Sequence, residues 1–179
     1  MANLQPAAWE NFYVIVGSSG GAMIGLQFIV ITLIAEMRKR TSIDSIRAFG
    51  TSTIMHLGGA FLVSAIMSAP WPSIYTLSIA LSICGLTGLS YGMIATHRAG
   101  RQQDYHPVWE DWLWFFILPT SIYVVLFIAA LLLHTTAPLA LYLIAAAALG
   151  LLFVGIRNAW DTVTYLVIEG SHGESKKKD

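Results

Sequence analysis

Five long apolar runs, separated by short polar segments, account for most of the 179-residue chain. The runs cover approximately residues 12–35, 48–69, 73–96, 109–133 and 137–156. Since a helix rises about 1.5 Å per residue, each run is long enough to cross a hydrocarbon layer about 30 Å thick. Only helices and closed barrels satisfy every backbone polar group in a bilayer, and runs without alternating polar residues exclude a barrel. The sequence therefore predicts an all-α integral membrane bundle of five transmembrane helices.

The composition supports a lipid bilayer as the main partner. Hydrophobic residues make up 56% of the chain and charged residues only 11%, less than half of the roughly 25% found in a typical soluble domain. Such a composition excludes an intrinsically disordered chain. Ten basic residues balance ten acidic ones, so no basic excess is available for binding nucleic acid.

The chain is expected to form one domain over residues 1–169. Arg157 interrupts the fifth run, and the segment from Arg157 to Ile168 either extends the fifth helix or lies along the membrane interface. Small and charged residues dominate from Gly170 to Asp179, which predicts a flexible charged tail. The first run has no basic N-terminal flank and is too long for a signal-peptide core, so we expect it to remain as a membrane span.

The basic residues of the connections predict the orientation. They follow only the first, third and fifth spans, as Arg38, Lys39, Arg40 and Arg47, then Arg98 and Arg101, then Arg157 and Lys176, Lys177 and Lys178. The segment before the first span and the other two connections contain no lysine or arginine. Because cytoplasmic loops carry an excess of these residues, we expect the N-terminus outside and the C-terminus in the cytoplasm.

Three polar residues inside the spans are candidates for a functional layer: Gln27, His56 and Tyr91. Gln27 and His56 lie at matching depth, each about 5 Å from the middle of its span toward the cytoplasmic side. Polar side chains at membrane depth are rare and often functional. They either hydrogen-bond to one another and hold helices together, or line a pathway or a site for a small solute.

A second group of polar residues is expected at the cytoplasmic rim of the bundle. It comprises Glu36, His97, Asp111, Arg157, Asn158 and Asp161. Ion pairs such as Arg157 with Asp161 are the simplest interpretation of this group. A site for a lipid headgroup or a small anion is the functional alternative, with Arg157 as the donor.

Glycine residues at four-residue spacing predict close helix packing of the glycine-zipper type. Such residues occur in the first span as Gly17, Gly21 and Gly25, and in the third as Gly88 and Gly92. Small residues let helix backbones approach closely in a membrane. The contact is either within the chain or between subunits of a homo-oligomer. The fourth span has few small residues, so we expect it to be the most peripheral.

No cofactor, metal or catalytic motif is expected. The histidines do not share a depth, which argues against haem held by two histidines, and Cys84 is the single cysteine. Metalloprotease, phosphate-loop and serine-nucleophile motifs are also lacking from the sequence.

Three short segments resemble an uncharacterised family of small five-span proteins of the bacterial inner membrane. They are Trp9-Glu10-Asn11-Phe12, Gly25-Leu26-Gln27-Phe28 and the segment from Gly155 to Asp161. The resemblance implies a location in the bacterial inner (plasma) membrane and no catalytic activity.

Three function classes follow from these patterns. The first is a non-enzymatic scaffold, regulator or accessory subunit that contacts another membrane protein. The alternative is an oligomeric channel or small-solute transporter with Gln27 and His56 on its pathway. The third is a lipid-modifying enzyme, which would need a catalytic pair at the rim drawn from His97, Asp111 and Asp161.

Overall fold

The computed structural model describes residues 7–37, 43–99 and 109–175. Within these ranges it describes the side chains of residues 9–32, 51–97, 109 and 112–164. The side chains of Glu36 and Asp111, which the sequence assigns to the rim, therefore lie outside the described residues.

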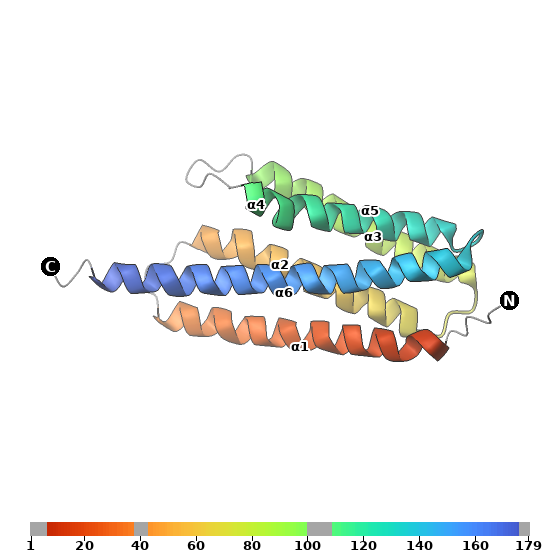
Figure 1. Cartoon of the computed structure of the whole chain (residues 1–179), viewed down its shortest axis with the longest axis horizontal. Helices are drawn as coiled ribbons and strands as arrows, with labels where there is room; N and C mark the ends of the chain where they lie inside the picture. Colours follow the sequence, from red (N-terminus) through yellow and green to blue (C-terminus); the bar gives the residue numbers. More distant parts are fainter. Residues whose placement is uncertain (1–6, 38–42, 100–108, 176–179) are drawn as a thin grey trace.

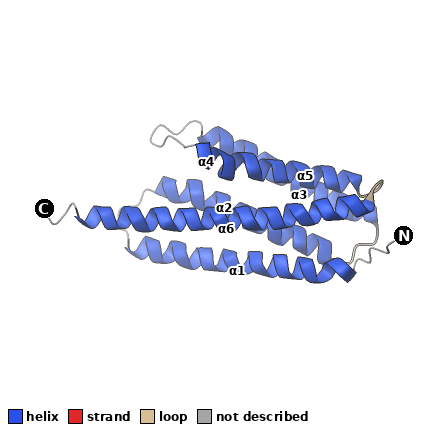
Figure 2. Cartoon of the chain, in the orientation of Figure 1, coloured by secondary structure: helices blue, strands red, loops and turns tan. Residues whose placement is uncertain are grey.

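The described chain is entirely helical apart from short turns (Figures 1 and 2). Its helices are α1 (Ala7–Met37), α2 (Ile43–Ser68), α3 (Ile74–Ala99), α4 (Trp109–Trp112), the π-helical η1 (Leu113–Ile117), α5 (Leu118–Leu132) and α6 (Ala137–Ser175). Five segments are long and apolar enough to cross a membrane, namely Trp9–Thr32, Thr51–Ser68, Ile74–His97, Leu113–Leu132 and Ala137–Thr164. The predicted five-span helical bundle is confirmed.

The residues after Arg157 continue the last helix. α6 runs without interruption from Ala137 to Ser175, so the segment from Arg157 to Ile168 extends the fifth span. The helix ends later than the sequence suggested, because it includes part of the segment expected as a tail. Residues 176–179 lie outside the described residues.

The helices alternate in direction along the long axis of the bundle (Figure 1). We call the end that holds the α2–α3 and α5–α6 turns the N-terminal end, and the opposite end, beyond which α6 projects, the C-terminal end. α1 packs against α2 and α6, whereas α5 packs against α3 and α6. α2 contacts α1, α3 and α6, so α2 and α6 form the centre of the bundle.

The fourth span is not the most peripheral one, contrary to the sequence expectation. In its apolar window 33% of the residues are buried inside the bundle, compared with 22% for the first span. The large side chains of α5 pack against glycines of α3, because Gly85 faces Phe127 and Gly88 faces Tyr123. Small residues on one helix of a pair are therefore sufficient for close packing, and α1 is the least buried span.

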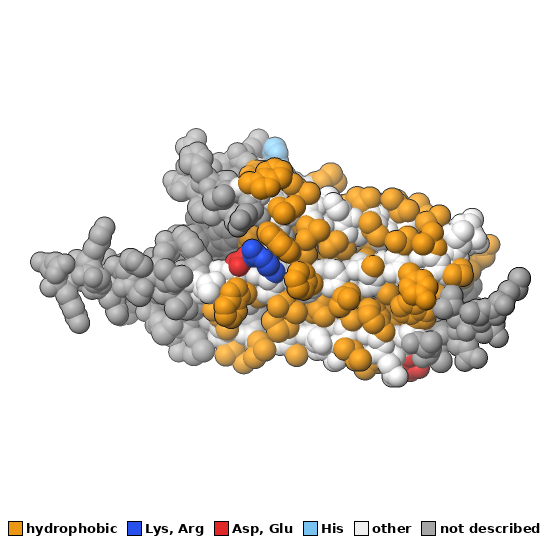
Figure 3. Space-filling view, in the orientation of Figure 1, with side chains coloured by type: hydrophobic (Ala, Val, Ile, Leu, Met, Phe, Trp, Pro, Cys, Tyr) orange, Lys and Arg blue, Asp and Glu red, His pale blue; other side chains and the backbone are white. Residues whose placement is uncertain are grey.

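The face of the bundle seen in Figure 3 is largely apolar along its middle. Side chains that are about half exposed or more include Ile15, Phe28, Ile79, Ile83, Leu131 and Phe153. Apolar side chains on this scale would be unfavourable in water, and they match the environment of lipid tails. A basic and an acidic side chain lie side by side near the C-terminal margin of this face (Figure 3), and the described residues include the ion pair of Arg157 with Asp161.

The arrangement leads to a test of orientation. All four lysines follow the first or the fifth span in the sequence. We expect a membrane-impermeant amine reagent to leave these lysines unmodified in intact cells and to modify them in inside-out vesicles, because basic segments remain in the cytoplasm. Mass spectrometry of the labelled chain measures the result, with detergent-solubilised protein as the fully labelled control. Lysine labelling in intact cells would contradict the predicted orientation and place the C-terminus outside.

Candidate functional site

Five buried polar side chains gather in the half of the bundle nearer the C-terminal end. We call them the polar layer; they are Gln27, Ser52, Thr53, His56 and Asn158, and each is at most 5% exposed. They come from α1, α2 and α6, the three helices that pack together in one half of the bundle. Buried polar groups are unfavourable unless they are hydrogen-bonded, so the partners of each side chain matter.

The register of the helices places these residues on the C-terminal side of a common reference level. Leu57 of α2 is the common reference point. A Cβ atom built on Gly20 would lie 3.2 Å from its carbonyl oxygen, and one on Gly155 would lie 3.2 Å from its backbone nitrogen. At about 1.5 Å per residue, Asn158 and Thr53 are displaced from this level toward the C-terminal end by about 5–6 Å and Gln27 by about 10 Å, whereas His56 lies close to it.

His56 has a hydrogen-bond partner at one of its two ring nitrogens. Its Nε2 lies 3.2 Å from Ser52 Oγ, one helical turn earlier on α2. The ring centroid is 6.3 Å from that of Tyr123 on α5. Among the described residues Nδ1 has no hydrogen-bond partner, although the side chain is only 2% exposed. His56 therefore presents one nitrogen to the interior of the bundle.

Tyr123 occupies space that two glycines leave free. A Cβ atom on Gly88 of α3 would overlap the Tyr123 ring, and one on Gly59 of α2 would lie 2.6 Å from its hydroxyl oxygen. The hydroxyl donates a hydrogen bond to the Met55 carbonyl oxygen at 3.3 Å. Tyr123 thus reaches from α5 across to α2, directly beside His56.

Asn158, which the sequence assigns to the rim together with Arg157, lies on the inner side of α6. It is fully buried, and its Nδ2 donates to the Trp114 carbonyl oxygen at 3.5 Å. Trp114 belongs to η1, where the Leu118 N–H bonds to the Leu113 carbonyl five residues earlier. Pro119 follows this wide turn, and proline prevents the ordinary bonding pattern of an α-helix. Among the described residues Asn158 Oδ1 has no partner.

Gln27 and Tyr91 differ in how far they enter the interior. Gln27 is 3% exposed, and its Nε2 has no hydrogen-bond partner in the described part of the chain. Tyr91 is partly buried on α3, which packs against α2 and α5. The structure therefore brings Gln27 and His56 to the same half of the bundle and adds Asn158.

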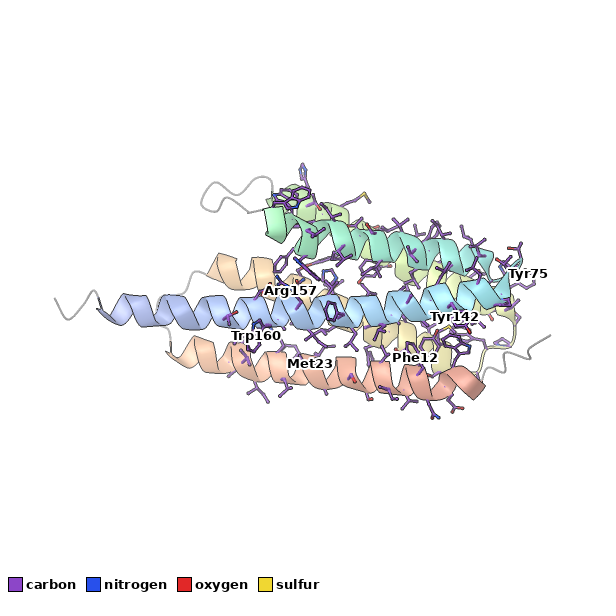
Figure 4. All side chains as sticks on the ribbon, in the orientation of Figure 1. Phe12, Met23, Tyr75, Tyr142, Arg157 and Trp160 are labelled. Carbon is purple, nitrogen blue, oxygen red and sulfur yellow. The ribbon has the colours of Figure 1, made fainter. Side chains whose placement is uncertain are left out.

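The rim residues that the structure describes form an ion pair and an aromatic contact. Arg157 NH1 pairs with Asp161 Oδ2, and the guanidinium lies 4.6 Å from the centre of the Trp114 ring. Figure 4 shows Arg157 on the side of α6 that faces α4. Both charged side chains are about one third exposed, so the pair contributes only about 0–1 kcal/mol. His97 is exposed on the last turn of α3.

The glycines that the sequence singled out have different environments. A Cβ atom on Gly17 would lie 2.9 Å from Ser64 Cβ of α2, and one on Gly92 would lie 3.0 Å from Thr120 Oγ1 of α5. Gly21 faces Phe61 at 3.8 Å, and Gly25 has no such neighbour within 4 Å. These neighbours of Gly17, Gly21 and Gly92, and the Tyr123 ring beside Gly88, thus belong to other helices of the same chain.

Sequence reasoning missed the inward position of Asn158 and the role of Tyr123. One signal was available for Asn158, because Gly155, Asn158 and Thr162 recur at helical spacing on one side of the fifth span. Tyr123 carries no comparable signal, since its partners Gly59 and Gly88 lie on other helices. In the described part of the chain, no three His, Cys, Asp or Glu side chains form a group that could hold a metal ion.

No protein-family model, curated protein or solved structure matches the chain, so no family is identified. The sequence resemblance to small inner-membrane proteins assigns no residue a role. Any function must therefore be argued from the polar layer and its surroundings.

The fit of Tyr123 between two glycines leads to a stability prediction. We expect Gly88→Ala to destabilise the bundle by about 1–3 kcal/mol, because the new methyl group displaces a buried, hydrogen-bonded ring. Gly25→Ala is the matched control, since a Cβ atom there meets no atom within 4 Å. Thermal unfolding in mild detergent measures both variants. Equal midpoints for Gly88→Ala and the wild type would contradict the packing described here.

Proposed function

We propose that the protein is a channel or transporter of small solutes and that the polar layer is its solute site. Three buried polar atoms without partners among the described residues carry this proposal: Gln27 Nε2, His56 Nδ1 and Asn158 Oδ1. They belong to α1, α2 and α6, and all three lie within membrane spans. A solute between helices would supply the missing partners.

The partial hydrogen bonding of two side chains favours a site over simple helix packing. His56 uses Nε2 toward Ser52, and Asn158 uses Nδ2 toward Trp114. In each case one polar atom is hydrogen-bonded and the other, which we call an open atom, has no partner among the described residues. An unpaired buried polar atom costs about 1–3 kcal/mol, so side chains that served only to join helices would gain by pairing fully. A side chain that one hydrogen bond fixes in place, and whose second polar atom is left for a ligand, is typical of a binding site.

Flux measurements test this proposal. We expect liposomes containing the wild-type protein to take up glycerol or urea faster than protein-free liposomes, as recorded by stopped-flow light scattering. Asn158→Leu has nearly the same volume and removes both polar atoms, so we expect it to reduce the protein-dependent rate about tenfold while the bundle stays folded. Gln27→Leu should act in the same direction.

Ser78→Ala serves as the control for these variants. Ser78 is buried, and its hydroxyl donates to the Ala130 carbonyl oxygen at 2.7 Å, so its removal changes interior polarity outside the polar layer. We expect its flux to equal that of the wild type. Wild-type rates equal to those of empty liposomes for water, glycerol and urea would reject the transport function.

A scaffold, regulator or accessory subunit is the second candidate, and α1 favours it. Only 22% of its apolar window is buried. Its outward side carries the exposed residues Ser18, Ala22 and Gly25, and Gly25 has open space where a side chain would lie. Such a face allows close approach of another transmembrane helix, from a different protein or from a second copy.

Crosslinking in native membranes tests the accessory function. We expect a photoreactive side chain at Ala22 to capture a defined partner or a second copy, because small residues on α1 leave room for a neighbouring backbone. The same group at Ile83, which is 59% exposed on α3, is the control for contacts with lipid or passing proteins. Repeated recovery of the uncrosslinked chain from Ala22 would count against this candidate.

The lipid-modifying enzyme has less support than either candidate. Asp161 is engaged by Arg157, and His97 lies on α3, which packs against α2 and α5. These observations do not favour a catalytic pair between the two side chains.

A further inference from the structure

The interior of the bundle changes character at Tyr123. Toward the C-terminal end lies the polar layer with its three open atoms. Toward the N-terminal end the core is apolar, and its fully buried members include Ala60, Val63, Leu126, Ala130, Ile144 and Ala148. Tyr123 lies at the boundary between these two regions.

The two buried serines beyond Tyr123, Ser64 and Ser78, have hydrogen-bond partners. Ser64 donates to the Ala60 carbonyl oxygen at 2.8 Å, and Ser78 donates to that of Ala130 at 2.7 Å. Two further buried atoms without partners in the described part of the chain, Trp9 Nε1 and Tyr13 Oη, belong to the first turns of α1. The apolar core therefore separates the polar layer from the N-terminal end.

Water is the simplest molecule that satisfies the open atoms of the layer. Gln27 Nε2 donates, Asn158 Oδ1 accepts, and His56 Nδ1 does either according to its tautomer. Buried water typically makes about three hydrogen bonds to otherwise unpaired polar groups, whereas closely packed apolar regions exclude it. Water can thus be stable beside these three side chains but not among the alanines and leucines beyond Tyr123.

We propose that water and small neutral solutes reach the polar layer only from the C-terminal end, and that Tyr123 closes the layer toward the N-terminal end. The ring is suited to this role because it is 3% exposed. It is also fixed by Gly59 and Gly88 on two other helices and by its bond to Met55. The inference depends on the layer being a binding site but not on net transport across the membrane.

The chemistry of the layer also selects the class of solute. Its five side chains are amides, hydroxyls and an imidazole, without a carboxylate or a lysine. An ion would lose its hydration without gaining an opposite charge, which is strongly unfavourable. The layer therefore suits a neutral molecule that both donates and accepts hydrogen bonds, such as water or a small amide or alcohol.

Cysteine accessibility tests the direction of access. Ser52 and Ser64 are both buried serines on α2, and the contacts of Tyr123 with Met55 and Gly59 lie between them. Each is changed to cysteine in a Cys84→Ala chain, and the membranes are opened so that both sides meet a small water-soluble thiosulfonate. Because only a hydrated thiolate reacts, we expect Ser52→Cys to react about tenfold faster than Ser64→Cys. Equal rates, or an unreactive Ser52→Cys, would overturn the proposal.

Variants at Tyr123 test its closing role. Tyr123→Ala removes the ring, and we expect it to raise the reaction rate of Ser64→Cys about tenfold toward that of Ser52→Cys, since water then passes the boundary. Tyr123→Phe keeps the ring, so Ser64→Cys should stay protected. A protected Ser64→Cys in a folded Tyr123→Ala chain would reject Tyr123 as the closing side chain. If Tyr123→Ala fails to fold, the comparison of Ser52→Cys with Ser64→Cys in the intact chain still decides the direction of access.

The flux and accessibility results separate the two proposals. If Ser52→Cys reacts faster than Ser64→Cys but the protein shows no solute flux, the proposal of access from the C-terminal end is supported and the transport function is rejected. If the protein shows solute flux but Ser52→Cys is unreactive, the transport function is supported and access to the layer from the C-terminal end is rejected.

Discussion

The hydrogen bond inside hydrocarbon is the interaction on which the rest of this structure depends. The hydrocarbon of a bilayer supplies no water, so each polar group that faces lipid must find a partner in the protein. Hydroxyls on the outer surface do so within their own helices: Ser18, Thr32, Ser90 and Ser121 donate to carbonyl oxygens four residues earlier. Among the described residues five buried side-chain atoms are exceptions: Trp9 Nε1 and Tyr13 Oη near the start of α1, and the atoms of Gln27, His56 and Asn158 on which the proposed function rests.

Close packing between helices depends on the pairing of glycines with large side chains. Lipid tails are as apolar as leucine, so transmembrane helices associate through van der Waals packing and not through the hydrophobic effect. Gly85 receives Phe127, Gly88 receives Tyr123 and Gly150 receives Ile122, in each case across a helix boundary. This pattern makes α5 an integral helix despite its large residues, and it holds Tyr123 at the boundary of the polar layer.

The irregular turn at η1 connects the packing to the site. The wide turn before Pro119 includes the Trp114 carbonyl that receives Asn158. The Trp114 ring meanwhile lies against Arg157, the neighbour of Asn158 on α6. One residue of η1 thus contacts both the buried amide and the charged rim, and it ties α6 to the fourth span where the polar layer begins.

By itself the sequence determined the number of spans and their approximate positions, because about twenty apolar residues in a helix match the thickness of a bilayer. It also singled out Gln27 and His56 as polar residues inside membrane spans, because such residues are rare. Only the tertiary structure decided that Asn158 is interior, that Tyr123 separates a polar from an apolar region, and that α5 is not peripheral. The physical reason is that lipid and protein core are equally apolar. A hydrophobic pattern therefore shows that a helix is in the membrane but not which of its sides faces the protein.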